Sequence, residues 1–106
     1  MNDASDRRRG MSILTVLELE AAAGKAAEAL AVLSKHLGDT RARPGCEMVT
    51  VHQDQSDPDS ILLIERWASR ADDEAYRAWR AGDGAITEMA GLLVGANVRY
   101  FDDVDA

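Results

Sequence analysis

The chain has 106 residues, the size of one ordinary domain, and its 46% hydrophobic and 29% charged residues are typical of a globular protein. A formal net charge of -7 excludes a nucleic-acid partner, because binding a phosphate backbone needs clustered Lys and Arg. No apolar run approaches the roughly 18 residues of a membrane span, and no signal peptide is recognisable. We therefore expect a cytoplasmic protein without a membrane partner.

The two ends differ in composition from the middle. We expect residues 1–11 to be a disordered leader, because they hold the only basic run, three arginines flanked by Gly and Asp. The alternative for that run is a binding arm, and Met11 competes with Met1 as the natural start. Residues 102–106 are predicted to form a frayed acidic tail. The part between, residues 12–101, is predicted to be a single domain.

The first two predicted elements are a strand and a helix. Residues 12–20 alternate as a strand whose first half is apolar on both faces. From residue 25 the apolar spacing changes to three and four, which predicts an amphipathic helix ending at Gly38. Its apolar stripe consists of Ala26, Ala29, Leu30, Leu33 and Leu37.

A β-hairpin is predicted next, from strand 47–53 through the turn-forming residues 55–59 to strand 60–67. The second strand of this hairpin is the most hydrophobic stretch of the chain. Successive strand side chains point to opposite faces, so the four apolar residues at 61–64 give it an apolar surface on both sides. Ile61, Leu63 and Trp67 share one face, and Leu62 and Ile64 share the other. Both faces therefore need a cover.

Two helical pieces and a final strand complete the pattern. Ser69 is a predicted N-cap, with acidic residues following it in the first turn. The helix breaks near the Gly-Asp-Gly sequence at 82–84, and residues 85–93 are predicted to form a further helix. Residues 97–101 are the last predicted strand.

The resulting order, β-α-β-β-α-β, is that of a ferredoxin-like α+β fold, a four-stranded antiparallel sheet with helices on one face. Such a fold leaves the other face bare. Because the strands here are apolar on both sides, we expect a second copy of the sheet to cover it, which makes the protein a homodimer.

Several local sequences follow this order with a familiar spacing: Gly24-Lys25 before the first helix, Thr-Arg-Ala-Arg-Pro-Gly-Cys at 40–46, Asp-Pro-Asp at 57–59 and Glu-Arg-Trp at 65–67. Together they resemble the antibiotic biosynthesis monooxygenase family, over about residues 12–101. The resemblance implies a dimeric α+β barrel with a ligand pocket between sheet and helices in each subunit. It also implies oxidation of phenolic, anthrone or quinol substrates by molecular oxygen without metal or flavin, although members with other small-molecule activities are known.

The sequence departs from the family at two places. Many relatives carry a histidine in the helix after the Glu-X-Trp strand, where this chain has Tyr-Arg-Ala-Trp-Arg at 76–80. Some oxygen-using members carry an asparagine on the first strand, and residues 12–20 contain none. Candidate residues are therefore chosen from this chain's own pattern.

Tyr76, Trp79 and Arg80 stand at i, i+3 and i+4, so a helix presents them as one patch. An aromatic wall with a hydroxyl and a guanidinium suits a flat phenolic ligand, because the rings stack on it and the cation favours the phenolate. We assign Arg80 and Tyr76 catalytic roles and Trp79 a substrate-binding role. The alternative is that the two rings pack on the sheet while Arg80 reaches solvent.

Trp67 and His52 complete the candidate set. Trp67 is a second substrate-binding candidate, with a purely structural role as the alternative. His52 is a catalytic candidate because its unperturbed pKa of about 6.5 allows proton transfer near neutrality, and the alternative is a part-exposed structural residue. His36, near the end of the first helix, is expected to interact with the helix dipole.

Cofactors are not expected. Cys46 is the only cysteine and more plausible as a small buried hydrophobe than as a nucleophile. His36 and His52 lack the carboxylate or thiol spacing of a metal site, and no Gly-rich phosphate loop is present. The sequence therefore indicates a cofactor-independent monooxygenase acting on a small aromatic molecule. The alternative is a non-catalytic small-molecule binding or stress-associated protein of the same fold.

Overall fold

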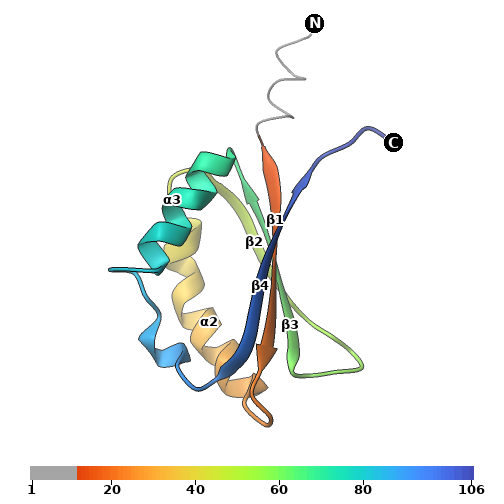
Figure 1. Cartoon of the computed structure of the whole chain (residues 1–106), viewed down its shortest axis with the longest axis vertical. Helices are drawn as coiled ribbons and strands as arrows, with labels where there is room; N and C mark the ends of the chain where they lie inside the picture. Colours follow the sequence, from red (N-terminus) through yellow and green to blue (C-terminus); the bar gives the residue numbers. More distant parts are fainter. Residues whose placement is uncertain (1–11) are drawn as a thin grey trace, which may run out of the picture.

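The structure is a computed structural model that describes residues 12–106, so the expected leader at 1–11 lies outside the described residues (Figure 1). The strands and helices follow the predicted order as far as the second helix. A single turn of 3₁₀ helix, η1, then precedes the last strand. The elements are β1 (Ile13–Ala21), α2 (Ala26–Arg41), β2 (Cys46–Gln53), β3 (Ser60–Trp67), α3 (Arg70–Arg80), η1 (Thr87–Met89) and β4 (Leu93–Asp102).

The four strands form one antiparallel sheet in the order β2-β3-β1-β4. Figure 1 shows α2 and α3 on the same side of this sheet. The predicted ferredoxin-like α+β fold is therefore confirmed. The hydrophobic strand β3 is central, with β1 and β2 as its neighbours, and its bounds are those predicted from its apolar run.

The inner face of the sheet, the one toward the helices, holds the core. Ile61 and Leu63 of β3 are 1% and 2% exposed, and they pack against the apolar stripe of α2. The next two residues of the same parity, Glu65 and Trp67, are buried as well. Leu62 and Ile64 lie on the outer face and are only half-buried. The prediction that β3 is apolar on both sides is confirmed, because Ile61 and Leu63 lie on the inner face and Leu62 and Ile64 on the outer one.

The predicted end of the first helix is wrong. Helix α2 runs through Gly38 and ends at Arg41. Gly38 sits on the exposed side and keeps an ordinary negative φ, so it needs no left-handed C-cap conformation. The extra turn brings Thr40, which is fully buried, under α3.

The predicted helix at 85–93 is also wrong. Only η1 is helical there, and β4 begins at Leu93, four residues before the predicted strand at 97–101. Gly91 adopts a φ of 80°, which belongs to the left-handed region and ends any right-handed helix. Residue 102 belongs to β4, and Asp103 of the predicted frayed tail pairs with Arg66 at 2.9 Å.

The Gly-Asp-Gly turn after α3 is packed tightly onto Trp79. The amide of Gly84 donates to the carbonyl of Trp79 at 2.8 Å, and a Cβ on Gly84 would clash with the carbons of the Trp79 ring. A Cβ on Gly82 would meet nothing closer than 3.7 Å. The backbone approaches the Trp79 ring so closely at position 84 that only glycine fits there. Position 82 has room for a Cβ.

We expect Gly84→Ala to lower the free energy of unfolding by about 1 to 3 kcal/mol, the usual cost of overpacking, because the Trp79 ring must move. Gly82→Ala is the matched control and should change it by less than about 1 kcal/mol. Urea unfolding of both variants measures the difference. Equal effects of the two substitutions would contradict the packing described for Trp79.

Candidate active site

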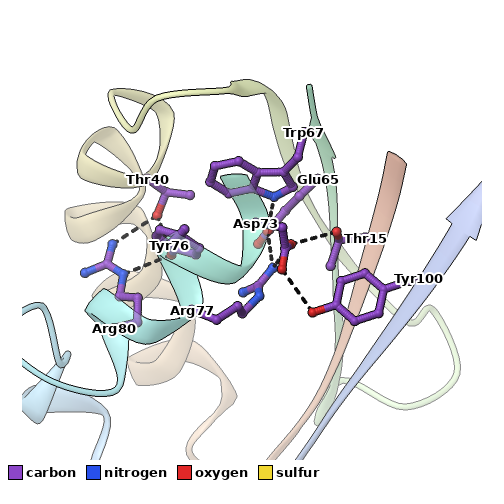
Figure 2. Close-up of polar contacts among 9 residues, drawn as sticks. All are labelled: Thr15, Thr40, Glu65, Trp67, Asp73, Tyr76, Arg77, Arg80 and Tyr100. Carbon is purple, nitrogen blue, oxygen red and sulfur yellow. Dashed lines mark hydrogen bonds and ion pairs between the residues drawn. The ribbon is translucent and has the colours of Figure 1, made fainter. Parts of the chain in front are cut away.

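The buried face of α3 is polar. Asp73, Tyr76, Arg77 and Arg80 stand at i, i+3, i+4 and i+7 and turn toward the sheet and α2 (Figure 2). The helix begins as predicted, because the Ser69 side chain accepts a hydrogen bond from the Asp72 amide at 3.1 Å. Its inner surface therefore docks through directional polar contacts rather than through an apolar stripe.

Asp73 is fully buried and accepts hydrogen bonds on both oxygens. Oδ2 accepts from the Thr15 hydroxyl of β1 at 2.8 Å and from Arg77 at 3.1 Å, and Oδ1 accepts from the Tyr100 hydroxyl of β4 at 2.9 Å. Three donors thus satisfy a carboxylate that has no contact with solvent. The first turn of α3 is thus tied to two strands of the sheet.

Arg77 joins this cluster to β3. Its guanidinium pairs with Glu65 as well as with Asp73, and Glu65 Oε1 also accepts from the indole nitrogen of Trp67 at 3.0 Å. Burial acts to lower the pKa of Arg77, but the two carboxylates outweigh it and hold the pKa above its usual range. The guanidinium is therefore permanently charged. Figure 2 shows Glu65, Trp67 and Arg77 converging at this point.

A second polar cluster joins α3 to the last turn of α2. The Tyr76 hydroxyl and the Thr40 hydroxyl lie 2.8 Å apart, and both accept from Arg80, at 2.9 Å from Nε and 3.0 Å from Nη2. Arg80 also donates to the backbone carbonyls of Gly84 at 3.0 Å and His36 at 3.2 Å. Arg80 does not extend into solvent, because its guanidinium holds two helices and the following turn together.

A cavity of about 200 Å³ lies between the sheet, both helices and η1. Four polar side chains form part of its wall, and apolar side chains from the sheet, α2 and the segment around η1 form the rest. The polar members are Glu65, Tyr76, Arg77 and Arg80, and the apolar ones include Leu17, Leu37, Leu63, Ile86 and Met89. A largely apolar space with a few polar groups on its wall has the character of a small-molecule site.

The structure brings Tyr76 and Arg80 to this cavity but not the two tryptophans. Trp79 packs outside it, with the guanidinium of Arg43 over its ring at 4.4 Å and Gly84 against it. Trp67 is 0% exposed and lies behind Tyr76, with 5.0 Å between ring centroids. Both rings support the wall rather than line it.

His52 lies away from the cavity. It is exposed on β2, shares the outer face of the sheet with Leu62, its partner on β3, and bonds to Thr50 at 2.8 Å. His36 departs from its predicted dipole interaction, because five residues of α2 follow it. Its ring nitrogen instead contacts Glu88 of η1 at 2.7 Å.

Four residues of the site are not predicted from the sequence: Thr40, Glu65, Asp73 and Arg77. A charged residue near a strand end is ordinarily solvated, but Glu65 has the same parity as Ile61, Leu63 and Trp67. That parity was the available signal for Glu65. For Asp73 and Arg77 the signal is their helical spacing with Tyr76 and Arg80, which forms a polar stripe and not an apolar one.

Among residues 12–106 no group of three His, Cys, Asp or Glu side chains is arranged to hold a metal ion. No helix in the same range is long and apolar enough to span a membrane. Cys46 is half-buried beside the core. Burial, followed by the charge of Glu65, raises its pKa and keeps it a thiol at neutral pH.

Residues 12–86 match the sequence model described as antibiotic biosynthesis monooxygenase. The chain belongs to this family. The match covers most of the described residues and every residue of the cavity wall except Met89 and Leu93. A comparison with curated proteins finds no match.

Solved structures of similar fold include members and relatives of this family. PA3566 from Pseudomonas aeruginosa is 21% identical, with a TM-score of 0.77 and coverage of 90% of this chain and 96% of that chain. A putative antibiotic biosynthesis monooxygenase from Deinococcus radiodurans is 23% identical, with a TM-score of 0.75 and coverage of 89% and 94%. SnoaB, a cofactor-independent oxygenase from Streptomyces nogalater, is 16% identical, with a TM-score of 0.77 and coverage of 91% and 96%. At these identities the likeness establishes the fold.

Tyr100 makes the stability of the polar cluster depend on pH. Burial, together with the hydrogen bond to Asp73, raises the pKa of Tyr100 above its ordinary value of about 10. The folded chain therefore holds this proton more tightly than the unfolded chain. The stabilisation is fully present below about pH 10 and is lost as the pH rises through the raised pKa.

We expect Tyr100→Phe to lower the free energy of unfolding at pH 7 by about 1.5 kcal/mol, the lower end for a hydrogen bond to a charged group. The difference from the unsubstituted protein should shrink above pH 10. Denaturant unfolding of both proteins from pH 7 to pH 11 tests this, because other alkaline effects cancel in the difference. A difference that stays constant over that range would show that the hydrogen bond to Asp73 does not form.

Proposed function

We propose that the protein is a cofactor-independent monooxygenase that oxidises a phenolic, anthrone or quinol-type small molecule with molecular oxygen. The observation that supports this most directly is the largely apolar cavity whose wall includes Tyr76 and Arg80, joined by a hydrogen bond from Arg80 Nε to the Tyr76 hydroxyl. In such a reaction the ionised substrate supplies the electrons. The protein then needs only an apolar pocket, donors for the anion and access for oxygen.

The reaction balances without a cofactor. An anthrone-type substrate loses a proton to give its phenolate, and O₂ then oxidises the ring CH₂ carbon to a carbonyl. One oxygen atom enters that carbonyl, and the other leaves as water with the two hydrogens. The carbon gives up four electrons and O₂ accepts four, so no external reductant is required.

Tyr76 is the residue best placed to stabilise the anion. Arg80 donates to the hydroxyl oxygen of Tyr76 and to that of Thr40. The two hydroxyls share one hydrogen bond, which uses the proton of one of them and leaves the proton of the other without an acceptor in this cluster. When Thr40 donates to Tyr76, the Tyr76 proton is free to point into the cavity. Tyr76 then donates to the substrate oxygen, and Arg80 polarises Tyr76 and holds it in position. His52 has no part in this arrangement.

The second candidate function is non-catalytic binding of a small aromatic molecule, as in a stress-associated protein of the same fold. It is favoured by the fact that four donor bonds of Arg80 already go to the protein itself. A binder needs the cavity but no proton transfer. The two functions differ in one measurable respect, which is turnover.

Oxygen uptake with a panel of quinols and anthrones tests the proposal. A dry cavity of about 150 Å³ holds one benzene ring, so the panel should begin with one- and two-ring compounds. We expect turnover of at least one of them, and a loss of about 100-fold in kcat for Tyr76→Phe, since one donor to the developing anion is removed. The Phe ring preserves the packing against Trp67.

His52→Gln is the control and should keep full activity, because His52 lies on the other face of the sheet. Tight binding across the panel with no oxygen uptake would favour the binding protein. Equal activity of Tyr76→Phe and the unsubstituted protein would remove Tyr76 from the reaction.

The outer face of the sheet supports a homodimer. Cross-strand partners share a face, so Leu14 lies beside Phe101, and Val16 beside Ile64. Phe101 and Met48 are 38% and 37% exposed and, by the strand register, share this face with Leu14 and Ile64. An apolar surface of this kind on a small domain is typical of an interface. Two copies packed through this face would bury it and leave both cavities on the outer sides.

We expect the chain to sediment as a dimer at micromolar concentration and Ile64→Asp to sediment as a folded monomer, because the new carboxylate would be buried without a partner. Ala31→Asp is the matched control, since Ala31 is exposed on α2, away from this face. It should remain dimeric. A monomeric unsubstituted protein would rule out this use of the outer face.

A further inference from the structure

Glu65 is a carboxylate that is 1% exposed and also forms part of the cavity wall. Its Oε1 is occupied, because it accepts from Trp67 and from Arg77. Its Oε2 accepts no hydrogen bond from any of residues 12–106. The cavity wall therefore includes a buried carboxylate that has one open acceptor.

Asp73, the other buried carboxylate, cannot play the same part. Both of its oxygens are occupied, by Thr15 and Arg77 on one side and by Tyr100 on the other, and it does not line the cavity. The two carboxylates share the single cation of Arg77, so the cluster carries one surplus negative charge.

We propose that Glu65 Oε2 accepts the proton whose removal ionises the substrate, while the Tyr76 hydroxyl donates to the oxygen that becomes negative. The inference rests on the proposed function for the chemical class of the ligand, a weak carbon or oxygen acid. In the step, the substrate C–H or O–H bond breaks, its proton bonds to Oε2, and the electron pair is delocalised onto the substrate oxygen.

Carboxylate bases remove protons from weak carbon acids in other enzymes when a tyrosine donor stabilises the resulting anion. The same two groups, a carboxylate acceptor and a hydroxyl donor, stand on the wall of one apolar cavity here. Trp67 and Arg77 orient the carboxylate by holding Oε1. Glu65 therefore needs no rearrangement before it accepts a proton.

Proton removal can be measured without oxygen. The probe is 2-tetralone, a two-ring ketone whose C1 hydrogens exchange with D₂O through its enolate, followed by proton NMR under anaerobic conditions. We expect the unsubstituted protein to accelerate this exchange above the buffer rate. Glu65→Gln should reduce the acceleration by about 100-fold or more, the usual contribution of a general base.

Glu74→Gln is the matched control, because Glu74 is exposed on α3 and pairs with Arg70 on the same helix. It should exchange at the unsubstituted rate. Thermal melting shows whether Glu65→Gln is folded. Glu65→Asp keeps the charge that pairs with Arg77 but shortens the reach toward the ligand, so its exchange rate should fall between those of Glu65→Gln and the unsubstituted protein.

The outcomes separate this inference from the oxygenase itself. No acceleration of exchange by the unsubstituted protein overturns the role of Glu65, whatever the variants do. An exchange rate in folded Glu65→Gln that is within threefold of the unsubstituted rate also overturns the role of Glu65. Exchange that depends on Glu65 but is accompanied by no oxygen uptake supports the proton acceptor and removes the oxygenase. Oxygen uptake that is unchanged in Glu65→Gln supports the oxygenase and removes Glu65 as its proton acceptor.

Discussion

Three charged side chains, Asp73 and Arg77 of α3 and Glu65 of β3, hold the second helix against the sheet. Both carboxylates are buried, and removal of Arg77 would leave them without a cation, a change that typically costs about 3 to 5 kcal/mol. Thr15, Tyr100 and Trp67 complete the donor set. Because hydrogen bonds are directional, this contact specifies one orientation of α3, whereas an apolar stripe would tolerate several.

That orientation determines the cavity. A helix docked through polar groups at one end does not fill the space beside it with apolar side chains, and the room that remains is bounded by Tyr76, Arg80 and Glu65. Arg80 then ties the neighbouring parts together, since it bonds to the last turn of α2 and to Gly84 of the following turn. The same contacts that stabilise the fold thus place a donor and an acceptor on the wall of a largely apolar space.

The two faces of the sheet are used differently. The inner face carries the core, the buried charges and the cavity, whereas the outer face carries apolar side chains on the side of the sheet away from α2 and α3. Within residues 12–106, α2 and α3 are the two α-helices, and both cover the inner face. In the proposed dimer, two sheets would cover each other's outer faces without touching the cavity, so assembly and the proposed chemistry would use different residues.

The sequence by itself determined the elements whose signal is local. The apolar run at 61–64 located β3, the turn residues before it located the hairpin, and Ser69 located the start of α3, because each depends on side-chain alternation, turn chemistry or capping. The order of these elements predicted the ferredoxin-like fold, with an antiparallel sheet and both helices on one face. The parity of Glu65 with Leu63 and Trp67 was also present in the sequence, although a charged residue at a strand end is ordinarily solvated.

The tertiary structure alone decided the rest. In the sequence, Asp73 and Arg77 have the pattern of exposed helix charges. They are paired because Thr15 and Tyr100 bond to Asp73, and Glu65 to Arg77, from distant parts of the chain. Residues 85–93 have helical spacing, but Gly91 and the pairing of β4 with β1 draw them into one turn and a strand. Periodicity records which side chains share a face of their own element. Which charges are neutralised, and which spaces stay open, depends on partners far away in sequence.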